Sequence, residues 1–327
     1  MSKRILLLGC GQLGSRHLQA LAVLDNVETI IVVDPNANGL ALGQQRLKEV
    51  PNANTRINYH WHQEIPAGIT VDLVVVATLA INRYEHIKTM LERVKVTNLL
   101  IEKIVTQSVE TYAALSQLLK KHKVNAWVNC KSRAYTIHQQ VKAMIKPHEP
   151  LVMTVIAGNQ GLATNGLHEI DLFFHYCPLS ELSVAVSQLD PIAHPSKRGN
   201  GIVDLSGLIV ANDKSGNSLS INFINDNQMP DTIFINTTSH RFIIDHFRKL
   251  FMVSTVERDW IWQTIGVDEP WQVSAMSTGF VNDILTKGSC LLPSLAQHQP
   301  AHDFLMSVIK PHLIKLGISC EQGCPVT

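Results

Sequence analysis

A glycine-rich stretch near the N-terminus has the spacing of a phosphate-binding turn. Gly9, Gly11 and Gly14 follow an apolar run at 5–8 and precede a helical pattern. Glycines at these places permit a tight turn, a close approach of the backbone to a pyrophosphate, and close packing of the helix on the strand. The positive end of such a helix attracts phosphate. We expect the turn to bind a dinucleotide through Gly9, Gly11, Gln12, Leu13 and Gly14.

A carboxylate follows at the distance expected of a ribose ligand. Asp34 closes the apolar run at 29–33, about 20 residues after the glycines. Its oxygens can accept hydrogen bonds from ribose hydroxyls, and its charge would repel a 2′-phosphate. The predicted cofactor is therefore NAD rather than NADP. A glycine turn that binds nothing is the alternative, but the strand, helix and acid together argue against it.

Two other places carry groups suited to proton transfer. Lys103 follows the run at 97–102, where an ammonium can stabilise a developing oxyanion; a surface ion pair with Glu102 is the alternative. His168 is suited to accept an alcohol proton, and Asp171, on the same helix face, can orient its imidazole. A core histidine and a metal triad of His168, Asp171 and His175 are the alternatives, and we expect no metal.

The elements that must position these groups change character near residue 129. Apolar runs alternate with helical patterns up to that point, which predicts an α/β Rossmann domain with a doubly wound parallel sheet over 1–129. Expected strands are 4–9, 29–34, 55–61, 71–77, 97–102 and 124–129, and expected helices are 14–25, 39–49, 82–93 and 108–122. Ligands of such sheets bind beyond the carboxyl ends of the strands. Thr78 and Glu102 follow or end two of these strands and are further cofactor-binding candidates.

Residues 130–327 are predicted to form an α+β domain with a largely antiparallel open sheet and a helical C-terminal tail. The turn residues at 212–217 indicate a hairpin. Expected strands are 151–157, 182–189, 203–211, 217–224, 231–237, 240–245 and 250–257, and expected helices are 133–145, 165–176, 273–286 and 301–316.

Composition limits the classes of partner. Hydrophobic residues make up 45% of the chain, charged residues make up 17%, and the formal net charge is +1. This balance gives no general field for nucleic acid or an anionic membrane. No apolar run approaches the ~20 residues of a membrane span, and the N-terminus lacks a signal-peptide pattern, so we expect a cytoplasmic protein. Six scattered cysteines indicate reduced thiols, and the tail with Cys320 and Cys324 is expected to fray rather than bind zinc.

The motifs Glu102-Lys103 and His168-Glu169-Ile170-Asp171 resemble those of the Gfo/Idh/MocA oxidoreductase family. The resemblance implies catalysis by Lys103 and His168, hydride transfer to or from a CH–OH or C=O group of a sugar-like substrate, and a homodimer or homotetramer. Two positions depart from the family pattern: Ile104 replaces a proline, and Thr164 stands where the family often has an aspartate. A catalytically silent NAD-binding regulator or scaffold and an NAD-using glycosidase remain alternatives.

Further residues are candidates for substrate binding. They are Arg133, Thr164, Asn165, Asp171, Lys197 and Arg198. The adjacent cations Lys197 and Arg198 can grip phosphate oxygens, which suggests an anionic or nucleotide-linked sugar, although a solvated turn is the simpler interpretation. Arg83 is expected to begin a helix in contact with solvent.

Overall fold

The computed structural model describes residues 2–158, 161–196, 199, 201–267 and 273–327. The chain forms two compact units. The first comprises Met1–Thr106, Glu110–Asn129 and Pro270–Ala296, and the second comprises Gln107–Val109, Cys130–Glu269 and Gln297–Thr327. This division differs from the predicted boundary between residues 129 and 130 at 107–109 and at 273–296, because a hydrophobic pattern marks a helix but not the sheet against which it packs.

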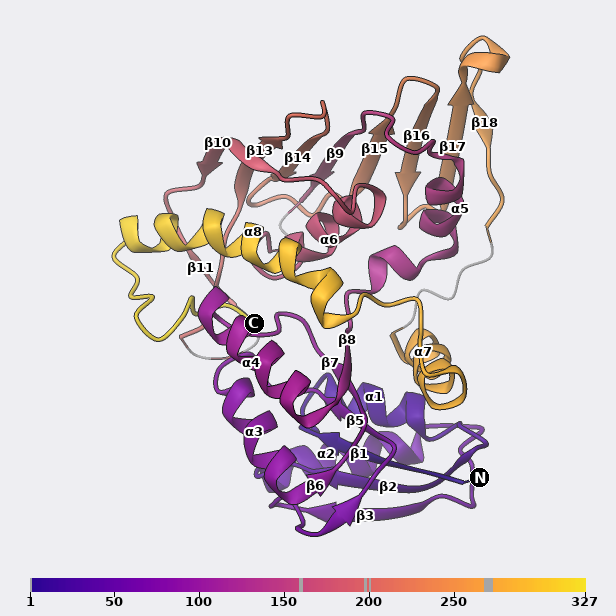
Figure 1. The fold of residues 1–327 in the computed structure, drawn as a ribbon, viewed down its shortest axis with the longest axis vertical. Helices are drawn as coiled ribbons and strands as arrows, with labels where there is room; N and C mark the ends of the chain where they lie inside the picture. The colour runs from indigo at the N-terminus through magenta and orange to yellow at the C-terminus, as the bar shows by residue number, and fades with distance from the viewer. Residues whose placement is uncertain (1, 159–160, 197–198, 200, 268–272) are drawn as a thin grey trace. The chain divides into compact units, whose positions relative to one another are not determined.

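The first unit is built on a six-stranded sheet in the order β3-β2-β1-β5-β7-β8 (Figure 1). Its strands are β1 (Lys3–Leu8), β2 (Val27–Val33), β3 (Asn58–His62), β5 (Leu73–Val76), β7 (Asn98–Ile101) and β8 (Asn125–Val128). Every neighbouring pair is parallel. The apolar runs of β1 and β5 are buried throughout their inner residues, as expected of strands covered on both faces. The predicted doubly wound sheet is confirmed.

Helices connect these strands and cover the sheet. They are α1 (Gly14–Leu21), α2 (Ala37–Lys48), α3 (Arg83–Arg93) and α4 (Val109–His122), and a small parallel pair is formed by β4 (Ile69–Thr70) and β6 (Val94–Lys95). Helix α7 (Val273–Lys287) joins this unit from far along the chain and packs on α1. The Thr278 hydroxyl donates a hydrogen bond to the Ala20 carbonyl oxygen at 2.9 Å.

The second unit is built on an eight-stranded sheet in the order β10-β13-β14-β9-β15-β16-β17-β18. The strands are β9 (Val152–Ala157), β10 (Ser183–Leu189), β13 (Gly207–Asn212), β14 (Ser218–Phe223), β15 (Thr232–Asn236), β16 (His240–Asp245), β17 (Leu250–Thr255) and β18 (Gln263–Thr264). Only the β14–β9 pair within this sheet is parallel, so the prediction of a largely antiparallel sheet is confirmed. Gly216, with φ of +86°, lies in the predicted β13–β14 hairpin.

Shorter elements complete the second unit. They are η1 (Lys131–Ala134), α5 (Thr136–Met144), α6 (Gly166–Tyr176), β11 (His194–Pro195), β12 (Val203–Asp204), η2 (Val256–Arg258) and, from Gln297 onward, α8 (Leu295–Lys315). Buried and half-buried residues alternate along β14 and β15, and α6 packs against β14. One face of the sheet therefore carries the core of this unit.

The C-terminal tail is packed, so the prediction of a frayed end is wrong. The Cys324 amide donates to the Gln107 carbonyl oxygen at 2.7 Å, and the Gln107 side chain donates to the Val326 carbonyl oxygen at 3.0 Å. Cys320 and Cys324 are both buried and free of disulfides. Hydrogen bonds to a distant segment hold the tail, and such contacts leave no local pattern in the sequence.

None of the helices in the described ranges is long and apolar enough to cross a membrane.

Candidate functional site

The glycine turn between β1 and α1 fits a dinucleotide. Gly9 has φ of +92°, and a Cβ atom on Gly14 would lie 2.0 Å from the Gly9 carbonyl oxygen, so both positions need glycine for the turn to form. A Cβ on Gly11 would meet no protein atom within 4 Å. The fold therefore does not itself require glycine at position 11, whereas close approach of a pyrophosphate would require it.

Asp34 is fixed beside this turn. One carboxylate oxygen accepts a hydrogen bond from the Cys10 amide at 2.7 Å, and the other accepts from the Asn36 amide at 2.8 Å. Each carboxylate oxygen has two lone pairs, so both oxygens retain acceptor capacity for ribose hydroxyls. The backbone bonds hold the acid at the end of β2, where the sequence predicted a ribose ligand.

Arg46, near the end of α2, holds the glycine turn through hydrogen bonds. No role in the site is predicted for this residue from the sequence. Its guanidinium donates to the Gln12 carbonyl oxygen at 2.6 Å and to the Ser15 hydroxyl at 2.7 Å. It also bonds the Gln12 side-chain oxygen at 2.5 Å. The side chain of Gln12 is thus held by Arg46, while Leu13 occupies the N-cap position of α1. A lone arginine on an exposed helix gives no sequence signal for such a contact.

Glu102 is part of a buried hydrogen-bond network. Its carboxylate accepts from His17 Nε2 at 2.6 Å and from the Asn129 side-chain amide. Burial opposes ionisation of this acid, but these two hydrogen bonds, the adjoining His17 and the charge of Lys103 together lower the pKa of Glu102. Glu102 and Lys103 are only 4% and 5% exposed, so the alternative of a surface ion pair is wrong. The peptide bond between Lys103 and Ile104 is cis.

Arg83 is buried rather than solvated, so the prediction for it is wrong. Its side chain is 1% exposed, and it bonds main-chain oxygens on both sides of Lys103. The acceptors of its Nη1 are the carbonyl oxygens of Glu102 (2.6 Å), Ile104 and Val105 (3.2 Å). Its Nη2 donates to the carbonyl oxygen of Thr78, whose hydroxyl lies 3.4 Å from Arg83 Nε. One guanidinium thus ties the segment after β5 to the segment after β7.

A sequence signal for this burial existed. Arg83, Ile87, Met90 and Leu91 share the buried face of α3 at the spacing of an amphipathic helix.

In the second unit, His168 lies on the first turns of α6 and is half-buried. Its Nδ1 is 3.3 Å from the sulfur of Cys130, which lies two residues after the end of β8. The same sulfur lies 3.7 Å from the Leu167 carbonyl oxygen. From the sequence, Cys130 is expected only to be one of six scattered reduced thiols, and no role in a site is predicted for it.

Asp171 is fully buried and bound by Arg133. The guanidinium Nε donates to Asp171 Oδ2 and Nη2 donates to Oδ1, each at 2.7 Å, in a two-pronged ion pair. Burial raises the pKa of Asp171 to about 6, although Arg133 and a hydrogen bond from Cys130 act to lower it. We expected Asp171 to orient His168 directly, but the structure pairs its carboxylate with Arg133 and places Cys130 against His168. Two residues proposed for substrate binding are thus each other's partners.

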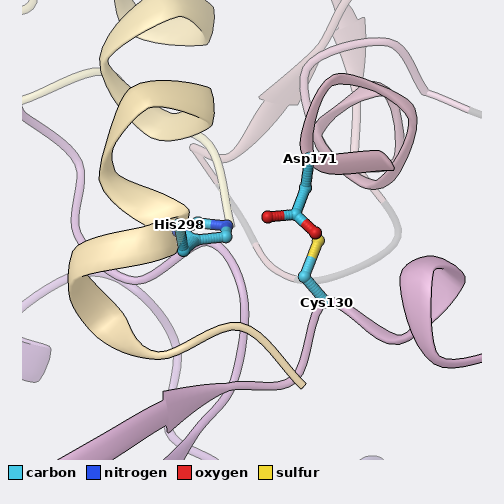
Figure 2. Close-up of side chains that lie close together, drawn as sticks. All are labelled: Cys130, Asp171 and His298. Carbon is cyan, nitrogen blue, oxygen red and sulfur yellow. The ribbon is translucent and has the colours of Figure 1, made fainter. Parts of the chain in front are cut away.

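Cys130, Asp171 and His298 form a compact polar cluster (Figure 2). Their potential ligand atoms all lie within 4.8 Å of one another, and all three residues are buried. Burial, and then the charges of His302 and Arg133, lower the pKa of His298 well below its usual value, so its imidazole is neutral. A metal ion here would compete with the Arg133 guanidinium for Asp171, which favours a hydrogen-bonded cluster.

This cluster differs from the triad of His168, Asp171 and His175 that helix spacing offers as an alternative metal site. The last helix is predicted to begin at residue 301, whereas α8 starts at Leu295 and includes His298.

Thr164 precedes α6 and is bound by a carboxylate. Its hydroxyl donates to Asp204 Oδ2, and the amide of Ala163 donates to Asp204 Oδ1 at 2.8 Å. The amide of Asn165 donates to the Gly161 carbonyl oxygen at 2.7 Å. Asp204 was missed because it fell within an expected strand, yet it brings a carboxylate to the position where Thr164 departs from the family pattern.

Lys197 and Arg198 lie outside the described residues.

Comparison with known proteins supports the cofactor site. Residues 3–130 match a family model described as oxidoreductase family, NAD-binding Rossmann fold. No curated protein sequence matches the chain.

Several solved structures share the fold over nearly the whole chain. UDP-N-acetylglucosamine 3-dehydrogenase GnnA from Acidithiobacillus ferrooxidans is 13% identical with a TM-score of 0.72, covering 97% of this chain and 99% of that one. An oxidoreductase from Agrobacterium radiobacter in complex with NAD+, L-tartaric acid and magnesium is 14% identical with a TM-score of 0.72, covering 97% and 99%. A lysine-to-alanine mutant of KijD10, a 3-ketoreductase from Actinomadura kijaniata in complex with TDP-benzene and NADP, is 13% identical with a TM-score of 0.71, covering 95% and 98%.

Proposed function

Because residues 3–130 match a family model of NAD-binding Rossmann-fold oxidoreductases and the motifs resemble those of the Gfo/Idh/MocA family, we propose that this chain transfers hydride between NAD and a sugar-like substrate. The reacting group is a secondary hydroxyl in oxidation or the corresponding ketone in reduction. NAD, when bound at the glycine turn, supplies the hydride acceptor or donor. Gly11, Asp34 and the amino end of α1 are the groups that hold it.

The observation that carries this proposal is the fixation of Lys103 at the carboxyl end of β7. The residue is nearly buried, and Arg83 bonds the carbonyl oxygens of Glu102 and Ile104 on either side of it. These bonds fix the main chain from which the Lys103 side chain extends, and burial restricts the side chain, which favours a preorganised ammonium. Lys103 donates a hydrogen bond to the reacting oxygen and stabilises the negative charge that develops there.

His168 moves the proton in this proposal. In oxidation its imidazole takes the proton of the substrate hydroxyl while hydride leaves the same carbon, and in reduction it returns a proton to the new alkoxide. Thr164 cannot serve as the base, since a hydroxyl has no suitable pKa. The Asp204 carboxylate that accepts its hydrogen bond keeps this segment in place ahead of α6.

Solved structures with the same fold suggest a class of substrate. UDP-N-acetylglucosamine 3-dehydrogenase and the 3-ketoreductase in complex with TDP-benzene both have this fold, and each is named together with a compound of a nucleoside diphosphate. We therefore propose a nucleotide-linked sugar as the substrate, with Lys197 and Arg198 as cations for its phosphates.

Absorbance of reduced nicotinamide tests the proposal. Purified protein is offered NAD with a panel of sugars, inositols and nucleotide-linked sugars, and NADH with the matching ketones. Turnover with at least one panel member, lost in a Lys103→Met variant that still binds NAD, supports the proposal. NAD binding without turnover on any compound would favour the silent regulator, and release of an aglycone without net NADH would favour the glycosidase.

A further inference from the structure

We propose that Cys130 is a positioning residue that fixes the tautomer of His168, so that the imidazole presents an unprotonated Nε2. This inference rests on the proposed function, in which His168 transfers the proton. It assigns to a thiol the task that the sequence analysis gave to the carboxylate of Asp171.

The contacts place the thiol between the imidazole and the ion pair. Cys130 Sγ lies 3.3 Å from His168 Nδ1 and also hydrogen-bonds the carboxylate of Asp171. Figure 2 shows Cys130 and Asp171 facing each other from separate segments. Asp171 is in turn held by two hydrogen bonds of 2.7 Å from Arg133. The contacts thus run from Arg133 to Asp171, then to Cys130 and then to His168, and all four residues belong to the second unit.

Counting donors and acceptors shows which group donates in each of these hydrogen bonds. An ionised carboxylate only accepts, and a carbonyl oxygen only accepts. The thiol has one proton, and its oxygen partners include the Asp171 carboxylate and the Leu167 carbonyl at 3.7 Å. The Asp171 carboxylate carries a full negative charge, so it is a better acceptor for the thiol proton than the neutral imidazole nitrogen of His168. The sulfur therefore faces His168 as an acceptor, and Nδ1 of the neutral imidazole must carry the hydrogen.

The hydrogen bond from His168 to the sulfur determines which ring nitrogen of His168 can accept a proton. With the hydrogen on Nδ1, the lone pair of the neutral ring is on Nε2, the nitrogen remote from the main chain. A sulfur acceptor is weaker than a carboxylate, so it sets the tautomer without stabilising the imidazolium as an adjoining aspartate would. His298, the neutral third member of the cluster, adds no charge to this arrangement.

Nuclear magnetic resonance of the protein labelled with ¹⁵N-histidine tests the proposal directly. Long-range proton–nitrogen correlations distinguish a protonated Nδ1 from a protonated Nε2, and a His168→Asn variant assigns the signals of residue 168 among the 15 histidines. We expect a protonated Nδ1 and an unprotonated Nε2 at neutral pH. In Cys130→Ser, whose hydroxyl can accept the same bond, the pattern should persist, and in Cys130→Ala it should become a mixture of the two tautomers.

Two controls make the result decisive. Cys177→Ser alters a thiol in the same unit whose sulfur lies 3.6 Å from the Asn217 side-chain oxygen, and it should leave His168 unchanged. EDTA should also leave the His168 signals unchanged, because the proposal involves no metal.

A protonated Nε2 in the unaltered protein would overturn the proposal. So would a signal in Cys130→Ala identical to that of the unaltered protein, or a His168 signal that shifts when EDTA removes a metal ion. If the alanine variant does not fold, the unaltered protein and the serine variant still decide the tautomer. The measurement needs no substrate, so failure of this proposal is distinguishable from failure of the proposed function, which would appear as an absence of turnover.

Discussion

The glycine turn of the first unit and the polar cluster of the second unit solve the problem of positioning in different ways. The turn is local: Gly9, Gly11 and Gly14 act through the backbone within one strand-turn-helix segment. The cluster is assembled from side chains that distant segments contribute, with Cys130 before η1, Asp171 on α6 and His298 on α8. Backbone-based sites leave a spaced pattern in the sequence, whereas sites built from side chains depend on packing that no local pattern specifies.

Lys103 belongs to the first unit, where the backbone positions the site, and its replacement should cause the largest loss of activity. Replacing it by methionine keeps the volume but removes the ammonium, so kcat should fall by about 10²–10⁴-fold while NAD affinity stays nearly unchanged. Steady-state kinetics on an identified substrate and calorimetric titration of NAD measure the two quantities. Lys95→Met, at an exposed position of the same unit, is the control and should retain full activity. Equal kcat in Lys103→Met and Lys95→Met would remove Lys103 from the chemistry.

The comparison also explains how much the sequence could predict. The six strands of the parallel sheet and the strand ends that carry Gly9, Asp34 and Lys103 follow from apolar runs and turn residues, whereas the order of the strands comes from the structure. The antiparallel character of the second sheet follows similarly. The partners of Asp171 and His168 could not be predicted, because a helix face shows which residues point the same way but not which segment packs against them. The role of α7 in the first unit was missed for the same reason.

Arg83 is an exception to this comparison, because in the first unit it is a side chain that holds the backbone in place. Arg83→Met would leave the carbonyl oxygens of Thr78 and Glu102, among others, without their donor. Loss of buried hydrogen bonds of this kind costs about 1–3 kcal/mol, so the free energy of unfolding in urea should fall by that amount and kcat should fall with it. Arg93→Met, at the exposed end of the same helix, should change neither. A stable and fully active Arg83→Met would show that Lys103 needs no such support.

A pair of glycine variants sharpens the comparison, because it separates the fold from the cofactor. In Gly14→Ala the new Cβ would collide with the Gly9 carbonyl oxygen, so both stability and NAD binding should fall, the former by about 1–3 kcal/mol. In Gly11→Ala the Cβ meets no protein atom within 4 Å, so the unfolding free energy should change by less than about 0.5 kcal/mol while NAD affinity falls about 10-fold or more. Thermal unfolding and calorimetry measure the two effects. Undiminished NAD affinity in Gly11→Ala would place the pyrophosphate elsewhere.

Asp34 tests whether the same unit also sets cofactor choice. The carboxylate should repel a 2′-phosphate, so Asp34→Ala should reduce the preference for NAD over NADP by about 10-fold. The variant also loses acceptors for the Cys10 and Asn36 amides, and its stability must therefore be measured alongside. Asp25→Ala, which removes an exposed acid from the same unit, controls for net charge. Tighter binding of NADP than of NAD by the unaltered protein would contradict the role of Asp34.

The smallest expected effect concerns Lys197 and Arg198, whose role rests on residue type alone. If these cations bind substrate phosphates, Lys197→Ala/Arg198→Ala should raise KM for a nucleotide-linked sugar by about 10-fold, with little change in kcat, because the contact is equal in the ground and transition states. Added salt should raise KM for the unaltered protein and affect the double variant less, since screening weakens only a charge contact that is still present. Lys214→Ala, in the β13–β14 hairpin, is a control for the loss of a loop cation. Equal KM values for the double variant and the unaltered protein, or activity restricted to neutral sugars, would leave substrate recognition to the described part of the second unit.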